Sequence, residues 1–409
     1  MGGTRRLNMT RAGANLTLTT SRALVLDFVR SAGPISRVEL ATLTGLTPAT
    51  MTNVMRQLLT DGLVVEVGRD LSTGGKPRVL LDINPTARFA VGIQLGADSL
   101  TYVVTNLGGA IVGRLRTRGA EDSPPVAVIS RMAGRAKQLI EDLGIDGQAV
   151  IGVGLAAPGS MDLDKGVLLA PPTLGQWSEY PLRDELEAAI GLPVLLDNDG
   201  TTSAVGEFWG GDVPDASTMC AVYLGAGIGA GILIGGTVFR GASSNVGELG
   251  QMWMTAPHSG AAPDTLERVA GPAGVAAAVR RALDAGAESS LELGGTDPIA
   301  DFTLIATAAL LGDPVAVAAI THSAQDLAEA VLIAANLFDL DFVVLAGPSV
   351  AIAGSMYVEI VQKRLDEGFF AKRRHGIEVR LSTHATDAAA VGAAALVLQH
   401  QLAPRSFGS

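Results

Sequence analysis

Several side chains between residues 47 and 56 are of the types that read DNA. The Asn53 amide and the Arg56 guanidinium can hydrogen-bond base edges in a major groove, and threonines can contact phosphates or thymine methyls. A helical stripe of apolar residues interrupts these polar positions and predicts that the polar side chains face outward. We therefore expect a DNA-reading surface made of Thr47, Ala49, Thr50, Thr52, Asn53 and Arg56.

Three basic side chains follow in a glycine-rich segment. We expect a strand over residues 63–67, a loop over 68–78 and a second strand over 79–83. This arrangement predicts a wing, in which Arg69, Lys76 and Arg78 reach the DNA backbone or a minor groove.

Three helical patterns must position these groups. The first begins at a Thr20-Ser21 cap and stops at Gly33-Pro34. The second begins at Ser36, which is expected to form a capping box with Glu39. We also assign Ser36 and Arg37 to the DNA-reading surface. It ends at Gly45, and the third starts at Thr47 with Pro48 in its first turn. Two helices joined by a glycine turn and followed by a wing predict a winged helix–turn–helix. The alternative is a helical protein–protein adaptor with a hairpin.

Charge is distributed unevenly along the 409 residues. Residues 1–90 hold eleven Lys/Arg and six Asp/Glu, whereas the rest holds 19 and 35. A basic head on an acidic body favours contact of the head alone with a polyanion, although the asymmetry can also arise by chance.

The single cysteine, Cys220, excludes a disulfide framework. The N-terminal residues show no apolar leader and no stretch is long enough to span a bilayer, so we expect a cytoplasmic protein with no membrane partner.

A β-rich unit occurs twice beyond residue 85. Strand patterns at 91–96, 100–105 and 110–115 are joined through a Leu-Gly pair and then a Gly-Gly turn, and the same order recurs at 222–225, 231–234 and 237–240. Two copies of a strand unit, each followed by helical sequence, predict an α/β body of two lobes with a cleft between them. This is the layout of the actin-like ATPase and sugar-kinase folds.

The chain resembles the ROK family, which includes transcriptional repressors of the NagC, XylR and Mlc types and sugar kinases. In the head, the resemblance lies in residues 33–41 (GPISRVELA), 44–47 (TGLT) and 74–78 (GGKPR). In the body, it lies in Trp177 with Pro181-Leu182, and in residues 191–199 (GLPVLLDND), 224–231 (LGAGIGAG), 240–242 (RGA) and 247–250 (GELG). It covers about residues 15 to 400.

The resemblance implies a general base but a degenerate nucleotide site. Asp199, delivered to the cleft at the end of strand 194–196, corresponds to the base that takes a proton from a sugar hydroxyl in family kinases. Where such kinases carry an Asp-x-Gly-Gly-Thr loop, this chain has Gln94 and Asp98, which remove a magnesium-orienting carboxylate and add negative charge. The adenosine-side glycines are replaced by residues 346–348 (AGP). The glycines of residues 225–231 are retained, and we expect them to serve backbone geometry alone.

The resemblance also implies a sugar site without zinc. The family's zinc histidine is replaced by Gln251, its cysteines are absent, and His258 is expected to be a satisfied or surface imidazole. Asn198, Asp199, Glu248 and Glu267 match sugar-binding positions, and Gln251 can hydrogen-bond in place of the histidine. For Glu248 and Glu267 the alternatives are a turn carboxylate and a helix N-terminal charge.

These inferences predict a flexible arm over residues 1–18, a winged helix–turn–helix over 19–85, lobe 1 over 88–199 with 386–402, and lobe 2 over 200–385. We expect a homodimeric or larger regulator, most simply a repressor, that binds operator DNA and a carbohydrate effector without catalysis, zinc, ATP or Mg²⁺. Two alternatives stay open: an active sugar kinase with a DNA-binding head, and a body that serves only for dimerisation or partner docking.

Overall fold

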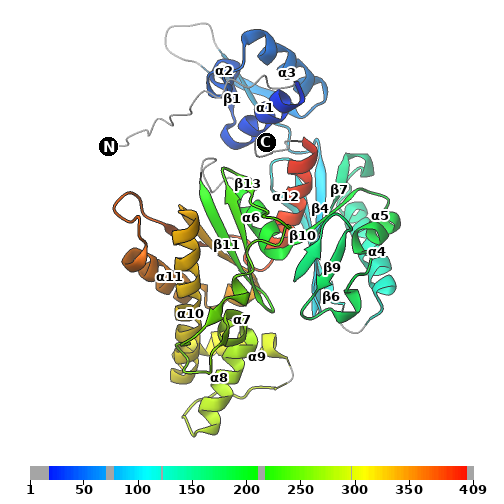
Figure 1. The fold of residues 1–409 in the computed structure, drawn as a ribbon. Helices are drawn as coiled ribbons and strands as arrows, with labels where there is room; N and C mark the ends of the chain where they lie inside the picture. Colours follow the sequence, from blue (N-terminus) through cyan, green and yellow to red (C-terminus); the bar gives the residue numbers. More distant parts are fainter. Residues whose placement is uncertain (1–17, 71–77, 121–122, 211–216, 296, 403–409) are drawn as a thin grey trace. The chain divides into compact units, whose positions relative to one another are not determined.

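The computed structural model describes residues 18–70, 78–120, 123–210, 217–295 and 297–402, and for residues 18–20, 69 and 70 it describes the backbone alone. The chain divides into two compact units after Asn84, which are described separately as the head and the body (Figure 1).

The head contains three helices and a three-stranded antiparallel sheet in the order β1-β3-β2. Buried Met51, Val54 and Leu58 of the third helix form the expected apolar stripe. The two-residue strand β1, which pairs with β3, was not predicted. The first helix begins at Leu18, two residues before the predicted cap, and Ser21 is buried inside the helix. The elements are α1 (Leu18–Ala32), β1 (Ile35–Ser36), α2 (Arg37–Thr44), α3 (Pro48–Thr60), β2 (Val64–Asp70) and β3 (Arg78–Ile83).

The body contains two five-stranded sheets of identical topology, which confirms the predicted repeat. In each sheet, three antiparallel strands are followed by two parallel ones, in the orders β6-β5-β4-β7-β10 and β13-β12-β11-β16-β17. The first sheet comprises β4 (Phe89–Leu95), β5 (Ser99–Asn106), β6 (Ile111–Arg118), β7 (Val150–Ala157) and β10 (Val194–Asn198). The second comprises β11 (Thr218–Leu224), β12 (Ile228–Ile234), β13 (Thr237–Val238), β16 (Phe342–Ala346) and β17 (Glu378–Leu381).

Helices cover both sheets and complete the lobes (Figure 1). In lobe 1, α4 and α5 pack against each other and contribute to a core with the first sheet, beside the β8–β9 hairpin. In lobe 2, the helices from α7 to α11 build the largest core. The bounds are α4 (Pro125–Asp142), β8 (Ser160–Asp162), β9 (Val167–Ala170), α5 (Leu182–Ile190), α6 (Asp199–Trp209), β14 (Trp253–Met254), β15 (Asp264–Thr265), α7 (Leu266–Ala270), α8 (Pro272–Asp284), α9 (Pro298–Leu310), α10 (Pro314–Phe338), α11 (Gly354–Gly368) and α12 (Ala388–Leu402).

Two helices cross where the lobes meet. The last helix, α12, lies on the first sheet, where a Cβ atom at Gly154 would stand 1.9 Å from the Ala393 carbonyl oxygen. The same helix touches α6, which packs on the second sheet, and a Cβ at Gly392 would stand 1.6 Å from the Thr202 carbonyl oxygen. Glycine is required at such backbone-to-backbone contacts. The crossing of α6 and α12 therefore joins the lobes (Figure 1).

Candidate functional site

The predicted DNA-reading residues of the head are mostly exposed. Thr47 caps α3 by accepting a hydrogen bond from the Thr50 amide at 3.2 Å, and Pro48 occupies the first turn. Gly45 between α2 and α3 has a φ of +67°, so the turn needs glycine. Arg37, Thr47, Ala49, Thr52, Asn53 and Arg56 are exposed, and Thr50 is half-buried. The geometry is that of a helix–turn–helix with a polar recognition surface on α3.

Ser36 corrects one prediction. Its side chain is buried, and its Oγ donates to the Glu39 carboxylate at 2.6 Å while accepting from the Glu39 amide. The Ser36 amide donates to the same carboxylate at 2.9 Å, which completes the predicted capping box. Because these bonds engage the hydroxyl in the interior, Ser36 positions α2 and does not belong to the DNA surface.

The wing contains the antiparallel strands β2 and β3, which are paired from Val64–Ile83 to Asp70–Arg78. Arg78 is exposed at the start of β3. The Arg69 side chain and Lys76 lie outside the described residues. Arg37 pairs with Glu66 of β2 at 3.4 Å, so one predicted DNA contact also links α2 to the wing.

A cluster of carboxylates from both lobes lies near the start of α6. Asn198 caps α6 by accepting from the Gly200 amide at 2.8 Å, and its amide group donates to the Gly159 carbonyl at 3.2 Å. Asp199 is the first residue of α6, and its carboxylate also accepts from the Gly200 amide. The Asp199 residue is half-buried. Desolvation of its carboxyl, with smaller contributions from the charges of Glu248 and Glu267, raises its pKa to about 7. Asp199 can therefore donate or accept a hydrogen bond near neutral pH.

Glu267 reaches the glycine loop between β11 and β12. Its Oε2 accepts from the Ile228 amide at 3.0 Å, and a Cβ at Gly227 would lie 2.1 Å from that oxygen. A side chain at position 227 would therefore displace the Glu267 carboxylate from this position. Glu248 is exposed, and partial desolvation of its carboxyl together with the charge of Glu267 raises its pKa. A Cβ at Gly229 would lie 3.8 Å from Asp199 Oδ1, and a Cβ at Gly250, two residues after Glu248, would lie 3.2 Å from Glu267 Oε2. The three acids thus come from distant segments to one place, which the chain separation alone does not reveal.

Gln251 ends the short turn Leu249–Gln251 that begins just after Glu248, and its side chain is exposed. Gln251, the residue predicted to replace a zinc-binding histidine, is therefore three residues from Glu248 along the chain.

Two interlobe contacts beside the cluster were not predicted. The Asn245 side chain exchanges two hydrogen bonds with the backbone of Met161, at 2.8 and 3.0 Å. Arg240 donates to the buried carboxylate of Asp197 at 2.6 Å. In the sequence, Arg240 stands out only as part of a family motif, because nothing there tells which acid it pairs with.

The predicted zinc-free segment contains one organised histidine. His258 lies 2.7 Å from the buried Asp326 carboxylate through Nδ1, and its amide donates to the same oxygen. The imidazole is satisfied by a carboxylate, as predicted. Within the described residues, no group of three His, Cys, Asp or Glu side chains is arranged to hold a metal ion.

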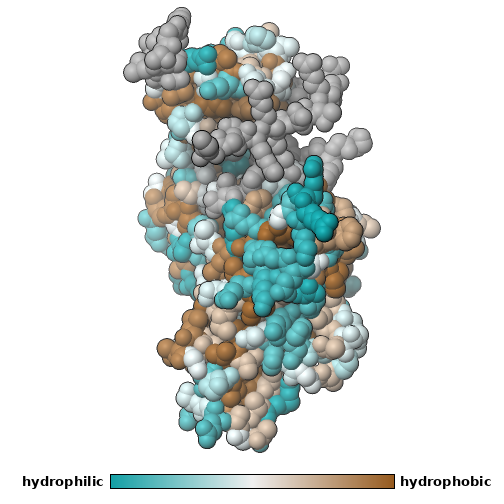
Figure 2. All heavy atoms as spheres, turned by 90° about the vertical axis from the view of Figure 1, so that its left-hand side faces the viewer, coloured by the Kyte–Doolittle hydropathy of each residue, from teal (hydrophilic) through white to brown (hydrophobic). Residues whose placement is uncertain are grey.

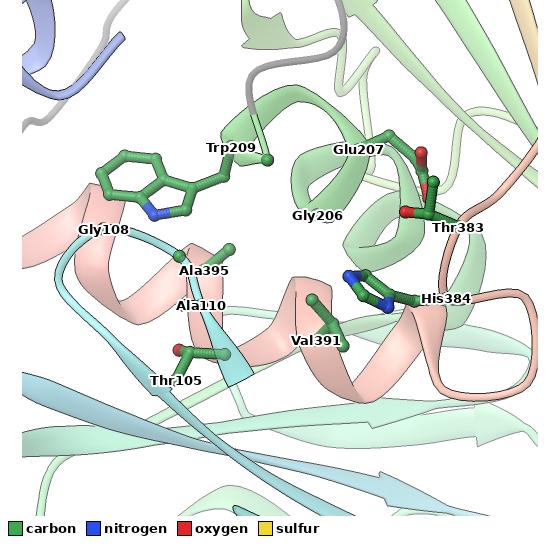
Figure 3. A pocket seen from close by; sticks show the side chains of 12 residues that line it. Thr105, Gly108, Ala110, Gly206, Glu207, Trp209, Thr383, His384, Val391 and Ala395 are labelled. Atoms are coloured by element: carbon green, nitrogen blue, oxygen red, sulfur yellow. The ribbon is translucent and has the colours of Figure 1, made fainter. Parts of the chain in front are cut away.

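A separate cavity of about 290 Å³ lies behind the crossing of α6 and α12. Its walls come from the β5–β6 turn, the end of α6, the segment before α12 and α12 itself (Figure 3). Glu207 and His384 are the ionisable side chains among them, and Glu207 is engaged by the Ser382 hydroxyl. None of the predicted sugar-binding residues lines this cavity.

In the described part of the chain, no single helix is long and apolar enough to cross a membrane, whereas α9 and α10, which meet at a bend of 109°, have the necessary length and apolar composition only when taken together.

The sequence matches known proteins along most of its length. The model of the ROK family matches residues 90–400. A putative xylose repressor of Caldicellulosiruptor sp. (strain Rt8B.4) is 29% identical over 386 residues, which cover 94% of this chain and 96% of the relative. The DNA-binding transcriptional dual regulator NagC of Escherichia coli K12 is 28% identical over 346 residues, 81% of each chain. A glucokinase of Halalkalibacterium halodurans is 28% identical over 322 residues, 77% of this chain and 96% of the enzyme.

Solved structures also resemble the chain. A ROK family transcriptional regulator, a homologue of the E. coli MLC protein, has a TM-score of 0.74 and 25% identity, covering 93% of this chain and 96% of that one. A ROK family glucokinase from Streptomyces griseus, solved with glucose and AMPPNP, has a TM-score of 0.64 and 24% identity, covering 75% and 98%. The second likeness establishes the fold of the body alone.

Proposed function

The chain belongs to the ROK family, and we propose that it is a transcription regulator whose body binds a carbohydrate effector without phosphorylating it. The head binds operator DNA, and the effector changes the operator affinity. The observation that carries this proposal is the joint presence of an exposed recognition helix and a carboxylate cluster at the lobe interface. Similarity to repressors over nearly the full length supports the same assignment.

The carboxylate cluster suits a sugar. Asp199, Glu248 and Glu267 offer several acceptor oxygens, and the raised pKa of Asp199 lets it donate as well. Sugar hydroxyls are both donors and acceptors, so such a mixed set satisfies them. The effector is therefore a neutral carbohydrate, since a negatively charged group would be repelled by the neighbouring carboxylates of Glu248 and Glu267.

The glycine loop favours binding without phosphoryl transfer. The Ile228 amide, which would otherwise be available to a phosphate oxygen, already donates to Glu267. Gln94 stands where family kinases carry a carboxylate, and Pro348 begins a 3-10 turn in the adenosine-side loop. A carboxylate on the loop opposes the approach of a polyanion, whereas phosphoryl transfer needs that charge neutralised.

One observation favours a sugar kinase as the second candidate. A carboxyl with a pKa of about 7 is well matched to general-base work at neutral pH. The similarity to a glucokinase over the body points the same way. A coupled assay with ATP, Mg²⁺ and a monosaccharide panel separates the two. Turnover that Asp199→Asn abolishes would establish the kinase, and absence of turnover with a sugar that binds supports the regulator.

We propose further that the regulator acts as a homodimer through lobe 2. Leu337 of α10 and Phe370 after α11 are 74% and 94% exposed, and the Phe370 amide donates to Asn336 of α10 at 2.9 Å, which holds the two elements together. The side of the body on which α10 and α11 lie in Figure 1 shows hydrophobic patches beside a hydrophilic band (Figure 2). Exposed aromatic and aliphatic residues rimmed by polar ones are typical of protein interfaces. Sedimentation of Leu337→Asp should show monomers where the unmodified chain sediments as a dimer.

A further inference from the structure

One tyrosine at the meeting point of the two lobes is surrounded by alanines. Tyr223 is 2% exposed and clusters with five alanines from β7 of lobe 1, β16 of lobe 2 and α12. Small side chains leave room for an aromatic ring, and here alanines of both lobes provide that room. The tyrosine ring therefore sits in a socket to which each lobe contributes: Ala156, Ala346, Ala388, Ala389 and Ala393.

The hydroxyl of this tyrosine is bonded across the lobe interface. The side-chain amide of Gln94 donates to Tyr223 Oη. Gln94 is the penultimate residue of β4 and Tyr223 is the penultimate residue of β11, and each strand is the central one of its sheet. The bond thus joins equivalent positions of the two repeats, Gln94-Leu95-Gly96 and Tyr223-Leu224-Gly225.

The tyrosine ring also covers the glycine loop. A Cβ at Gly225 would lie 2.9 Å from Cε1 of Tyr223, so the ring lies against the first glycine of the loop. Ser349 donates to the Gly225 carbonyl at 2.9 Å and fixes the loop from the side of β16. The ring and the loop therefore form one packed floor at the lobe interface.

The hydroxyl is also close enough to the carboxylate cluster to sense its charge. Burial, and then the charges of Asp199 and Asp387, raise the pKa of Tyr223 above its usual range, against the opposing effects of Gln94 and Arg116. The phenol stays protonated at neutral pH. Since Gln94 donates to its oxygen, the hydroxyl proton is left to donate to another acceptor.

We propose that Gln94 and Tyr223 form a latch between the lobes, which fills the floor of the would-be phosphate site and sets the angle of the cleft beside Asp199. The inference deepens the proposed function: the cleft angle that a bound nucleotide would hold in a kinase is held here by a side-chain pair. An effector that contacts Asp199 then shifts the lobes if its binding free energy exceeds the cost of breaking the Gln94–Tyr223 hydrogen bond and moving the packed Tyr223 ring.

The latch is tested by measuring the distance between the lobes in the full-length protein without sugar, DNA or nucleotide. Glu141→Cys on α4 and Lys363→Cys on α11 place one exposed label on each lobe, while Cys220 is buried. Pulsed dipolar spectroscopy of nitroxides then reports the populations of lobe separations. Tyr223→Phe and Gln94→Leu should each change the ratio of these populations about fivefold, as expected for a hydrogen bond with a net worth of about 1 kcal/mol. The double variant should change it no more than either single one.

Tyr357→Phe is the matched control. Its hydroxyl is equally buried, but it bonds Ser323 at 2.7 Å within lobe 2. It should lower the melting temperature and leave the lobe separations unchanged. Separations in Tyr223→Phe and Gln94→Leu that coincide with those of the unmodified chain, or additive effects in the double variant, overturn the latch. Either variant suffices if the other fails to fold. Such a result leaves the effector proposal intact, because no effector is present.

Discussion

Arg240 and Asp197 join the two lobes through an ion pair of 2.6 Å, in which the carboxylate is 1% exposed. Asp197 lies in β10 of lobe 1, directly before Asn198 and Asp199, and Arg240 follows β13 of lobe 2. The pair therefore fixes the end of the strand that carries the candidate sugar site to the opposite lobe.

Removal of this arginine should destabilise the body strongly. Arg240→Ala leaves the Asp197 carboxylate buried without its cation, and we expect a loss of about 3 kcal/mol in the free energy of unfolding by urea. Lys165→Ala is the control, because Lys165 pairs with Asp162 on the surface and should cost less than about 1 kcal/mol. Equal losses in the free energy of unfolding of the two variants would show that the Arg240–Asp197 pair stabilises the body no more than a surface ion pair does.

Arg56 should contribute to base reading. Its side chain is exposed on α3, so Arg56→Ala should weaken binding to a selected operator by about 1–3 kcal/mol and relax the preference at one base position. The operator is first enriched from random DNA with the full-length protein, and affinities are measured by fluorescence anisotropy. Arg281→Ala, an exposed arginine of α8 in the body, provides the control. Operator affinity that is the same for both variants refutes the role of Arg56.

Ser36 should act on folding of the head and not on base choice. Ser36→Ala removes the capping box of α2 and should lower the stability of the head by about 1 kcal/mol, seen as an earlier melting transition. The base preference recovered from random DNA should be unchanged. An altered preference at full stability would return Ser36 to the DNA surface.

Asp199 should make stability depend on pH in a distinctive direction. Its pKa is about 7 in the folded protein, mainly through burial, against an ordinary value near 3.8 in the unfolded chain. The folded state holds the proton more tightly, so this contribution to stability is full below about pH 4 and is lost as the pH rises through 7. The melting temperature of Asp199→Asn relative to the unmodified chain should therefore increase between about pH 5 and pH 8.

The control for this titration is Asp164→Asn, an exposed carboxyl in the β8–β9 turn. Its melting temperature relative to the unmodified chain should stay constant over the same range. If Asp199→Asn behaves like Asp164→Asn, the carboxyl is not held in a buried, negatively charged surrounding.

The sequence was most informative where local patterns decide the structure. The capping box at Ser36, the turn at Gly45 and the repeated strand units are encoded by neighbouring residues, and they were predicted correctly. The start of α1 was misplaced because a buried Ser21 looks like a cap in sequence. The strand β1 was missed because two residues show no periodicity and acquire their pairing only from β3.

The candidate site was predictable only where a family motif supplied the positions. Asn198, Asp199, Glu248 and Glu267 follow from the resemblance. The partners Arg240 and Asp197, and the bond between Gln94 and Tyr223, come from segments far apart in the chain. Such contacts depend on how the two repeats pack, which residue spacing does not encode.

The most direct test of the account is the operator affinity of the full-length protein, measured by anisotropy across a panel of neutral monosaccharides with no nucleotide present. We predict that at least one sugar changes the operator affinity about 5- to 150-fold, the usual range of allosteric coupling, and that Asp199→Asn removes this response while retaining sugar-free DNA binding. An operator affinity that no sugar changes, or a response that appears only when ATP and Mg²⁺ are added, would contradict it.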